Sequence, residues 1–180
     1  MLEIEIKVKV TDLRPIRERL RASGAALLGE GMEYDAYYNS PMRDFSKTDE
    51  ALRLRKADDC ALLTYKGAKI GSGSFKAREE LNIRVEWIET MDALLERIGF
   101  KKTAAVQKFR ESYRVGRATV TLDQVDGLGT FAEIEAAGEL TQAEAESEIE
   151  RIAKEYGIEG ERLTISYLEL LLEKQRVAQS

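Results

Sequence analysis

Two short segments far apart in the chain carry glutamates at alternate positions, with apolar residues between them. The first runs from residue 2 to 8 and contains Glu3 and Glu5, and the second runs from 131 to 136 and contains Glu133 and Glu135. Successive side chains of a β-strand point to opposite faces, so each segment places two carboxylates on one face and apolar side chains on the other. The sequence therefore predicts two strands that each present a pair of acids to one polar surface.

Basic residues lie between these acidic segments and follow the same alternation. Together with Lys66, they are Arg53 and Arg55, Lys76 and Arg78, and Lys108 and Arg110. For any single pair, a solvated face of an antiparallel sheet is the simpler interpretation. Taken together, however, the charges are sorted by sign from strand to strand, and a hollow sheet with a polar interior accommodates all of them. We therefore predict an α+β fold, an eight-stranded closed antiparallel β-barrel with helices packed outside.

Composition limits the class of protein. The chain has 180 residues, 43% of them hydrophobic, which is enough for one domain spanning 1–180 and short for two. No apolar run approaches the ~20 residues that span a bilayer, and no signal-peptide core is present, so we expect a cytoplasmic protein without a membrane partner. A net charge of −5 argues against a nucleic-acid partner. Cys60 is alone, and we expect a buried structural thiol in a reducing compartment.

The chain contains no histidine, which removes several kinds of catalytic site. A Ser-His-Asp triad, a histidine-assisted cysteine nucleophile and a zinc site of the His-Glu-x-x-His type are all excluded. Any metal ion must then be held by oxygen atoms, and carboxylates select hard ions such as Mg²⁺ or Mn²⁺.

Apolar spacing and capping residues predict four helices. We expect a first helix that Thr11-Asp12 caps and that ends near Ala22, and a second from Thr90 to Gly99 with Leu94 and Ile98 among its buried residues. The capping-box pattern Thr141 to Glu144 predicts the start of a third helix, and a fourth is expected near Ser166–Arg176. The predicted strands cover 2–10, 34–39, 51–56, 61–66, 76–85, 106–115, 118–123 and 130–136. Polar connections are expected at 41–49, 58–59 and 67–74.

Cations that converge from several strands suit a ligand whose negative charge is spread over many oxygens, because a guanidinium can bind phosphate through two hydrogen bonds. Carboxylates beside those cations would repel a phosphate unless a divalent ion lay between them. The acids are therefore interpreted as metal ligands and the bases as phosphate-binding groups. This division is typical of phosphoryl and nucleotidyl transfer, in which charge neutralisation needs no histidine.

The segment Glu3-Ile4-Glu5-Ile6-Lys7 resembles the Glu-x-Glu-x-Lys signature of the CYTH superfamily, the triphosphate tunnel metalloenzymes. Further segments resemble the family's motifs in order, and they lie at 34–39, 51–55, 63–67, 76–80, 108–110, 122–123, 127–129 and 131–135. The resemblance covers residues 1 to 172. It implies a metal-dependent enzyme that binds a triphosphate inside a β-barrel tunnel.

The resemblance also implies roles for individual residues. The metal-binding acids would be Glu3, Glu5, Asp123, Glu133 and Glu135, and together with Lys7 these would form the catalytic set. The triphosphate-binding bases would be Lys7, Arg53, Arg55, Lys66, Lys76, Arg78, Lys108 and Arg110. Arg78 and Glu80 fit a surface ion pair equally well. A structural role in a turn is expected for Asp126. Trp87, Tyr113 and Leu170–Leu172 are expected in the core or in an interface.

The reaction depends on which group attacks which phosphorus. The segments around 34–39, 43–55 and 127–129 resemble the class IV adenylyl cyclases, which convert ATP to cyclic AMP and pyrophosphate. The alternatives are a thiamine triphosphatase, an inorganic triphosphatase, and a non-catalytic protein that binds polyphosphate or nucleotides. The expected ligands are ATP or another triphosphate with Mg²⁺ or Mn²⁺, and the resemblance suggests a homodimer.

Overall fold

The computed structural model describes residues 2–57, 60–70, 76–138 and 140–178, with the backbone alone at residues 2, 3, 76, 77 and 178. The predicted turn at Asp58-Asp59 and the Gly71–Ser74 part of the predicted loop at 67–74 lie outside the described residues. In order, the elements are β1 (Leu2–Val10), α1 (Arg14–Ala22), β2 (Ala26–Asn39), α2 (Phe45–Thr48), β3 (Ala51–Ala57), β4 (Cys60–Lys66), β5 (Lys76–Val85), α3 (Ile88–Arg97), β6 (Lys101–Val115), β7 (Ala118–Val125), β8 (Gly129–Ala136), α4 (Gln142–Tyr156), β9 (Glu161–Leu163) and α5 (Tyr167–Ala178). No helix in the described part of the chain is long and apolar enough to cross a membrane.

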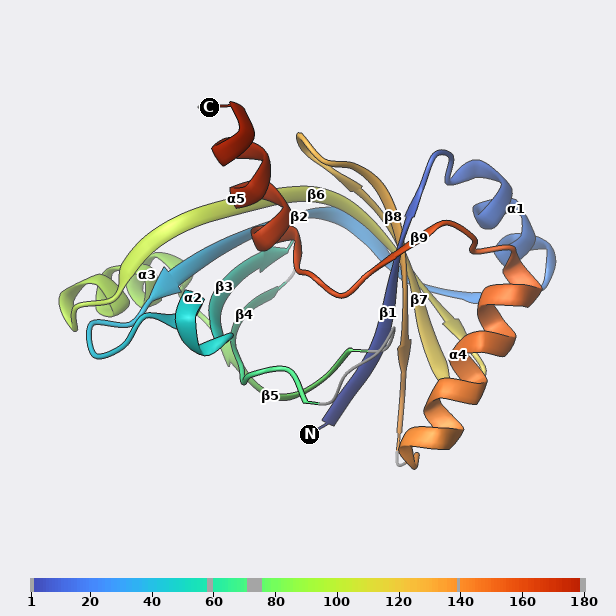
Figure 1. Ribbon diagram of the computed structural model, residues 1–180, viewed down its shortest axis with the longest axis horizontal. Helices are drawn as coiled ribbons and strands as arrows, with labels where there is room; N and C mark the ends of the chain where they lie inside the picture. Colours follow the sequence, from blue (N-terminus) through green and yellow to red (C-terminus); the bar gives the residue numbers. More distant parts are fainter. Residues whose placement is uncertain (1, 58–59, 71–75, 139, 179–180) are drawn as a thin grey trace.

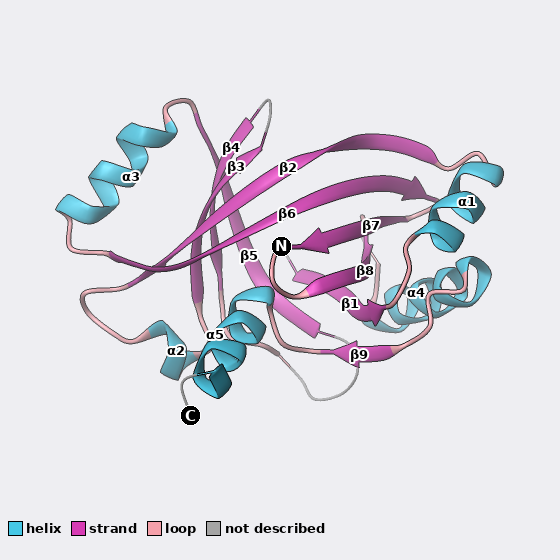
Figure 2. Ribbon diagram, turned by 90° about the horizontal axis from the view of Figure 1, so that it is seen from above, coloured by secondary structure: helices cyan, strands magenta, loops and turns pink. Residues whose placement is uncertain are grey.

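The strands form one antiparallel sheet that curls strongly around its concave face (Figures 1 and 2). The strand order is β5-β4-β3-β2-β6-β7-β8-β1-β9. β1 therefore lies between β8 and β9, and its first residues also pair with β5, from Leu2 opposite Glu79 to Glu5 opposite Lys76. The long paired strands β2 and β6 arch over the molecule from α3 at one end to α1 and α4 at the other (Figure 2). The prediction of an α+β fold with an antiparallel sheet and helices outside it is confirmed.

The apolar core lies between the convex face of the sheet and the helices. At one end, Leu20 of α1 and Ile149 of α4 pack against apolar side chains of β1, β7 and β8 such as Ile6 and Ile134. At the other end, Leu95 of α3 and Phe45 of α2 pack against β2 and β3. Full burial of one such side chain contributes roughly 1.5–3 kcal/mol. The alternation thus sends aliphatic side chains outward to the helices and leaves the polar side chains on the concave face.

Two of the predicted helix starts need correction. The capping box of Thr141 and Glu144 is confirmed at the start of α4. By contrast, α1 has Leu13 as its N-cap, and Asp12 accepts a hydrogen bond from the backbone N–H of Arg14, within the first turn. The N-cap of α3 is Trp87 rather than Thr90. The N-cap therefore lies three residues earlier than predicted, and Ile88, the first residue of the helix, packs against the α3 end of the core.

The strand predictions were too short where pairing, rather than local pattern, determines the strand. β2 begins at Ala26 instead of 34, and β6 begins at Lys101 instead of 106, because the two strands pair along almost their full lengths across two bulges. The predicted polar connection at 41–49 contains the one-turn helix α2, which Asp44 caps. β9 was not predicted, so the sheet has nine strands in the described residues rather than eight.

Several burial predictions were wrong. Cys60 is only half-buried. Trp87 is 65% exposed and so lies outside the core, which leaves the interface alternative for this residue. Leu94 and Ile98 are also exposed, because Ile88, Met91 and Leu95 form the face of α3 that contacts the sheet. Tyr113 lies in the core as predicted, with 1% of its surface exposed.

Candidate active site

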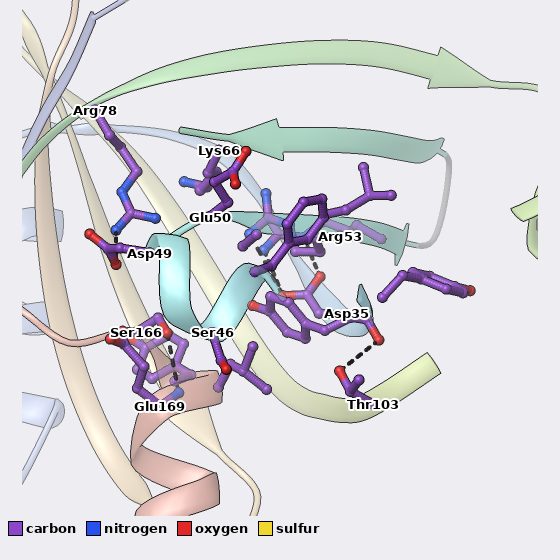
Figure 3. Close-up of a pocket in the computed structure, with 18 of the residues that line it drawn as sticks. Asp35, Ser46, Asp49, Glu50, Arg53, Lys66, Arg78, Thr103, Ser166 and Glu169 are labelled. Atoms are coloured by element: carbon purple, nitrogen blue, oxygen red, sulfur yellow. Dashed lines mark hydrogen bonds and ion pairs between the residues drawn. The ribbon is translucent and has the colours of Figure 1, made fainter. Parts of the chain in front are cut away.

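The concave face of the sheet surrounds a cavity of about 700 Å³ (Figure 3). The predicted site residues whose side chains line it are Glu5, Lys7, Arg53, Arg55, Lys66, Arg78, Lys108, Arg110, Glu133 and Glu135, and Glu80 lies among them. They come from six strands: β1, β3, β4, β5, β6 and β8. The alternation of each strand explains why these polar side chains share one surface.

Three predicted residues are placed differently. At Glu3 and Lys76 the structure describes the backbone alone, which pairs Glu3 with Arg78 and Lys76 with Glu5 across the β1–β5 contact. Asp123 has no exposed surface and lies behind the cavity wall. Its Oδ1 accepts a hydrogen bond from Arg110 Nε at 2.7 Å, and its Oδ2 accepts from Arg110 Nη2 at 2.5 Å and from the Tyr167 hydroxyl at 2.7 Å. Both carboxylate oxygens are therefore already engaged.

Asp35 joins three of the predicted bases. Its carboxylate accepts two hydrogen bonds from Arg55, at 2.6 and 2.8 Å, and one from Lys108 Nζ at 2.8 Å, while Arg53 Nη1 lies 3.9 Å away. Asp35 is 1% exposed. Burial alone would raise its pKa, but the charge of Arg53 and the hydrogen bonds from Arg55 outweigh burial and hold the pKa well below the usual value. One buried anion thus allows three cations to lie side by side.

Glu33 adds a second acid to this group. Its Oε2 lies 3.1 Å from Arg55 Nη1 and 2.9 Å from Lys108 Nζ. Sequence reasoning assigned no role to Glu33 or Asp35. The signal was present, because both alternate with Tyr37 on one face of β2, but the predicted strand began at residue 34 and excluded Glu33.

Two buried donors at the cavity have no acceptor in the described part of the chain. Arg53 Nε and Arg78 Nε are both buried, and neither meets a hydrogen-bond acceptor among the residues that the structure describes. Among the described residues, these side chains make long hydrogen bonds, 3.4 Å from Arg53 Nη2 to Thr64 Oγ1 and 3.5 Å from Arg78 Nη2 to Asp49 Oδ1. Figure 3 shows both arginines at the cavity, Arg78 directed toward Asp49. A buried N–H without a partner is costly, so this surface is suited to an anionic ligand with several oxygens.

The carboxylates gather on β1 and β8. Glu5 lies directly opposite Glu135 in the strand register and is 7% exposed. The pKa of Glu135 is raised to about 6, first because protein surrounds the group and then because Glu5 and Glu80 are negatively charged. Glu135 itself is exposed and lines the cavity. Such mutually repelling acids are relieved by a proton or by a cation.

These acids fit a hard divalent ion. All their donor atoms are oxygens, as Mg²⁺ and Mn²⁺ prefer. Glu5 and Glu135 are the best placed to hold such an ion, with Glu133 beside them on the cavity wall. Among the described side chains, no group of three or more acids or cysteines is already drawn together around one metal position.

Part of the cavity wall was not predicted at all. α2 and α5 contribute uncharged lining groups, including Phe45 and Ser46 from α2 and Leu168 and Leu172 from α5, beside Tyr37 of β2. These helices reach the cavity through tertiary packing, and Tyr167 and Leu168 belong to an apolar cluster with Val106 and Phe131. The periodicity of α5 predicts a helix but does not reveal where it docks.

Comparison with known proteins agrees with this architecture. The CYTH domain family model matches residues 1–167. The "Putative adenylate cyclase MJ0240" of Methanocaldococcus jannaschii is 40% identical over 135 residues, which cover 75% of this chain and 77% of that protein. The adenylate cyclase CyaB of Aeromonas hydrophila is 25% identical over 133 residues, covering 73% and 67% of the two chains.

A solved structure extends the similarity to almost the whole chain. The PH1819 protein of Pyrococcus horikoshii superposes with a TM-score of 0.83 and 39% sequence identity, covering 96% of this chain and 99% of that one. The family match spans every strand from β1 to β9 and the start of α5. This chain therefore belongs to the CYTH domain family.

Proposed function

We propose that this protein is a divalent-metal-dependent enzyme that acts on triphosphates inside its cavity, and that it converts ATP to cyclic AMP and pyrophosphate as a class IV adenylyl cyclase does. The observation that carries the proposal is the convergence of arginines and lysines on one cavity in which the buried Nε donors of Arg53 and Arg78 have no acceptor among the described residues. The names of two relatives, one of them 40% identical, support cyclisation as the reaction.

In this proposal, the residues divide the work by charge. The phosphates are bound by Lys7, Arg53, Arg55, Lys66, Lys76, Arg78, Lys108 and Arg110. The metal ligands are Glu3, Glu5, Glu133 and Glu135, and we leave Asp123 out because both of its oxygens are engaged. The bound Mg²⁺ or Mn²⁺ would lower the pKa of the attacking hydroxyl. The arginines and lysines neutralise the charge that develops on the leaving phosphates.

We further propose that strands β1 to β8 close into a tunnel. The support is the antiparallel pairing of β1 with β5 over four residue pairs, which joins the two ends of the strand order β5-β4-β3-β2-β6-β7-β8-β1. A closed wall would present the bases of β3 to β6 and the acids of β1 and β8 to the same substrate from all sides.

The direct test is incubation of the purified protein with ATP, and separately with inorganic triphosphate, in Mg²⁺ or Mn²⁺, with the products resolved by chromatography. From ATP, we expect cyclic AMP and pyrophosphate in equal amounts. Release of orthophosphate without cyclic AMP would overturn cyclisation in favour of hydrolysis, since the same phosphate-binding groups would serve attack by water. No turnover, together with a thermal shift on adding triphosphate and metal, would indicate a binding protein.

Arg53 provides a test of phosphate binding. Arg53→Ala is expected to lower kcat/KM about 10- to 100-fold at subsaturating substrate, because a charged hydrogen-bond donor of the cavity is lost. Arg151→Ala is the matched control, since Arg151 lies on the outer surface of α4 and is half-exposed. Unchanged kcat/KM in the Arg53 variant would refute its role in binding phosphate.

A further inference from the structure

Five side chains at the junction of the sheet and α5 form a closed cycle of contacts. Glu133 lies between two bases, with Oε1 3.3 Å from Lys7 Nζ and Oε2 2.6 Å from Arg110 Nη2. Arg110 is hydrogen-bonded to Asp123, and Asp123 accepts a hydrogen bond from the Tyr167 hydroxyl. The cycle is completed by the ring of Tyr167, whose centroid lies 4.2 Å from Lys7 Nζ. A residue of the C-terminal helix therefore contacts two of the charged groups of β1 and β7 directly.

Tyr167 is held firmly in this position. It is 5% exposed, and its ring packs edge-on against Phe131 at a centroid distance of 5.0 Å. The backbone carbonyl of Ile165, two residues before Tyr167, accepts a hydrogen bond from Lys7 Nζ at 3.1 Å. Burial and the nearby charges of Glu133 and Asp123 raise the pKa of Tyr167 well above its usual value, so its hydroxyl remains a donor.

The cycle determines which donors of Arg110 face a ligand. In the described part of the chain, every hydrogen bond of Arg110 uses Nε or Nη2. Among the described residues, the two N–H groups of Nη1 donate no hydrogen bond, and the side chain of Arg110 lines the cavity. Because a guanidinium is planar, fixing Nε and Nη2 on one carboxylate also fixes the direction of the Nη1 donors. Asp123 can hold the guanidinium in this way because it lies directly opposite Arg110 in the β6–β7 register.

We propose that Tyr167 and Asp123 are positioning residues that orient Arg110 and Lys7 toward the phosphates of the substrate, and that Asp123 is not a metal ligand. The inference rests on the proposed triphosphate-binding function. It means that α5 contributes to triphosphate binding through Tyr167. The Tyr167 hydroxyl limits the rotation of the Asp123 carboxylate, and its ring and the Ile165 carbonyl hold the Lys7 ammonium. Neither residue needs to touch the reacting atoms.

The test is calorimetric binding of inorganic triphosphate in excess Mg²⁺ to the wild type, Tyr167→Phe and Asp123→Asn. Phenylalanine keeps the ring over Lys7 and the packing against Phe131, and removes only the hydrogen bond to Asp123. We expect Kd to rise about 5- to 10-fold in Tyr167→Phe and about tenfold or more in Asp123→Asn. Tyr156→Phe is the matched control, because it removes another buried tyrosine hydroxyl, bonded to Ser23 Oγ at 3.0 Å in the α4 region.

Two further measurements separate positioning from a structural or metal-binding role. Titration with Mn²⁺ in the absence of triphosphate should give the same affinity for the wild type and both variants. The double variant should bind triphosphate no more weakly than Asp123→Asn alone, because both changes act through the same arginine. A merely structural contribution of Tyr167 would instead lower the melting temperature and leave the triphosphate Kd unchanged.

The outcomes are distinct. Wild-type triphosphate affinity in Tyr167→Phe, or independent and additive effects in the double variant, would overturn the positioning role. Loss of Mn²⁺ affinity in Asp123→Asn would show that Asp123 is a metal ligand after all. A wild-type protein that binds no triphosphate would overturn the proposed function, and the positioning role with it.

Discussion

Replacing Asp35 with asparagine is expected to destabilise the fold by about 3–5 kcal/mol, because the change leaves buried cations without their shared anion. Asp35 is 1% exposed and contacts Arg55 and Lys108 through hydrogen bonds no longer than 2.8 Å, with Arg53 close by. Glu33 remains in the variant, but it already forms ion pairs with Arg55 and Lys108 and so does not replace the lost charge. Urea denaturation at neutral pH measures the loss.

Glu150→Gln is the matched control for this experiment. It also converts a carboxylate into an amide and removes an ion pair, but Glu150 and its partner Arg162 lie on the surface, where such pairs contribute little. We expect its midpoint to stay close to that of the wild type. A similar midpoint for Asp35→Asn would mean that Asp35 does not hold the cations of β3 and β6 together.

The same carboxylate predicts a pH dependence with a definite sign. The folded pKa of Asp35 lies well below the ordinary value of 3.8, so the unfolded chain binds the proton more tightly. Its stabilising contribution is therefore complete above that ordinary value and is lost as the pH falls through the lowered folded pKa. The difference in unfolding free energy between wild type and Asp35→Asn should accordingly shrink in acid, which urea titrations at several pH values would measure.

Alternation along the strands made much of this arrangement predictable. The side chains of Lys108 and Arg110 were expected on one face of a strand, and both reach the cavity. On β3, the same alternation directs Leu52 and Leu54 to the opposite face, where they join the core. A period of two is a local property, so it can be recognised without any knowledge of which strand pairs with which.

Features that depend on tertiary pairing could not be predicted in this way. The first eight residues of β2 contain two glycines and no β-branched residue, and they are a strand because β6 lies beside them. The docking of α5, which brings Tyr167 to Asp123, depends on contacts between residues 44 positions apart. The alternation of β2 could have placed Asp35 on the polar face. Its role as the shared partner of three cations can be recognised only from the positions of those cations in the fold.

The second large effect is expected at the acidic side of the cavity. Glu5→Gln should reduce metal-dependent turnover about 10³-fold, because a charged ligand of the proposed Mg²⁺ or Mn²⁺ site is lost. Glu18→Gln, on the exposed side of α1, is the control and should leave turnover unchanged. If Glu5→Gln retains both turnover and Mn²⁺ affinity, Glu5 does not bind the metal.

Titration of Glu135 offers a readout of the same site that does not depend on turnover. Its folded pKa of about 6 exceeds the ordinary 4.5, so the folded metal-free protein binds this proton more tightly than the unfolded chain does, and stability should fall as the pH rises from about 4.5 to 6. A divalent ion competes with that proton, so Mn²⁺ affinity should rise over the same pH interval and level off above it.

In Glu5→Gln one source of the raised pKa of Glu135 is absent, and the rise in Mn²⁺ affinity should therefore move to lower pH. Calorimetry in buffers of different ionisation enthalpy would detect the accompanying proton release, and a rise at the same pH in both proteins would mean that Glu5 does not act on Glu135.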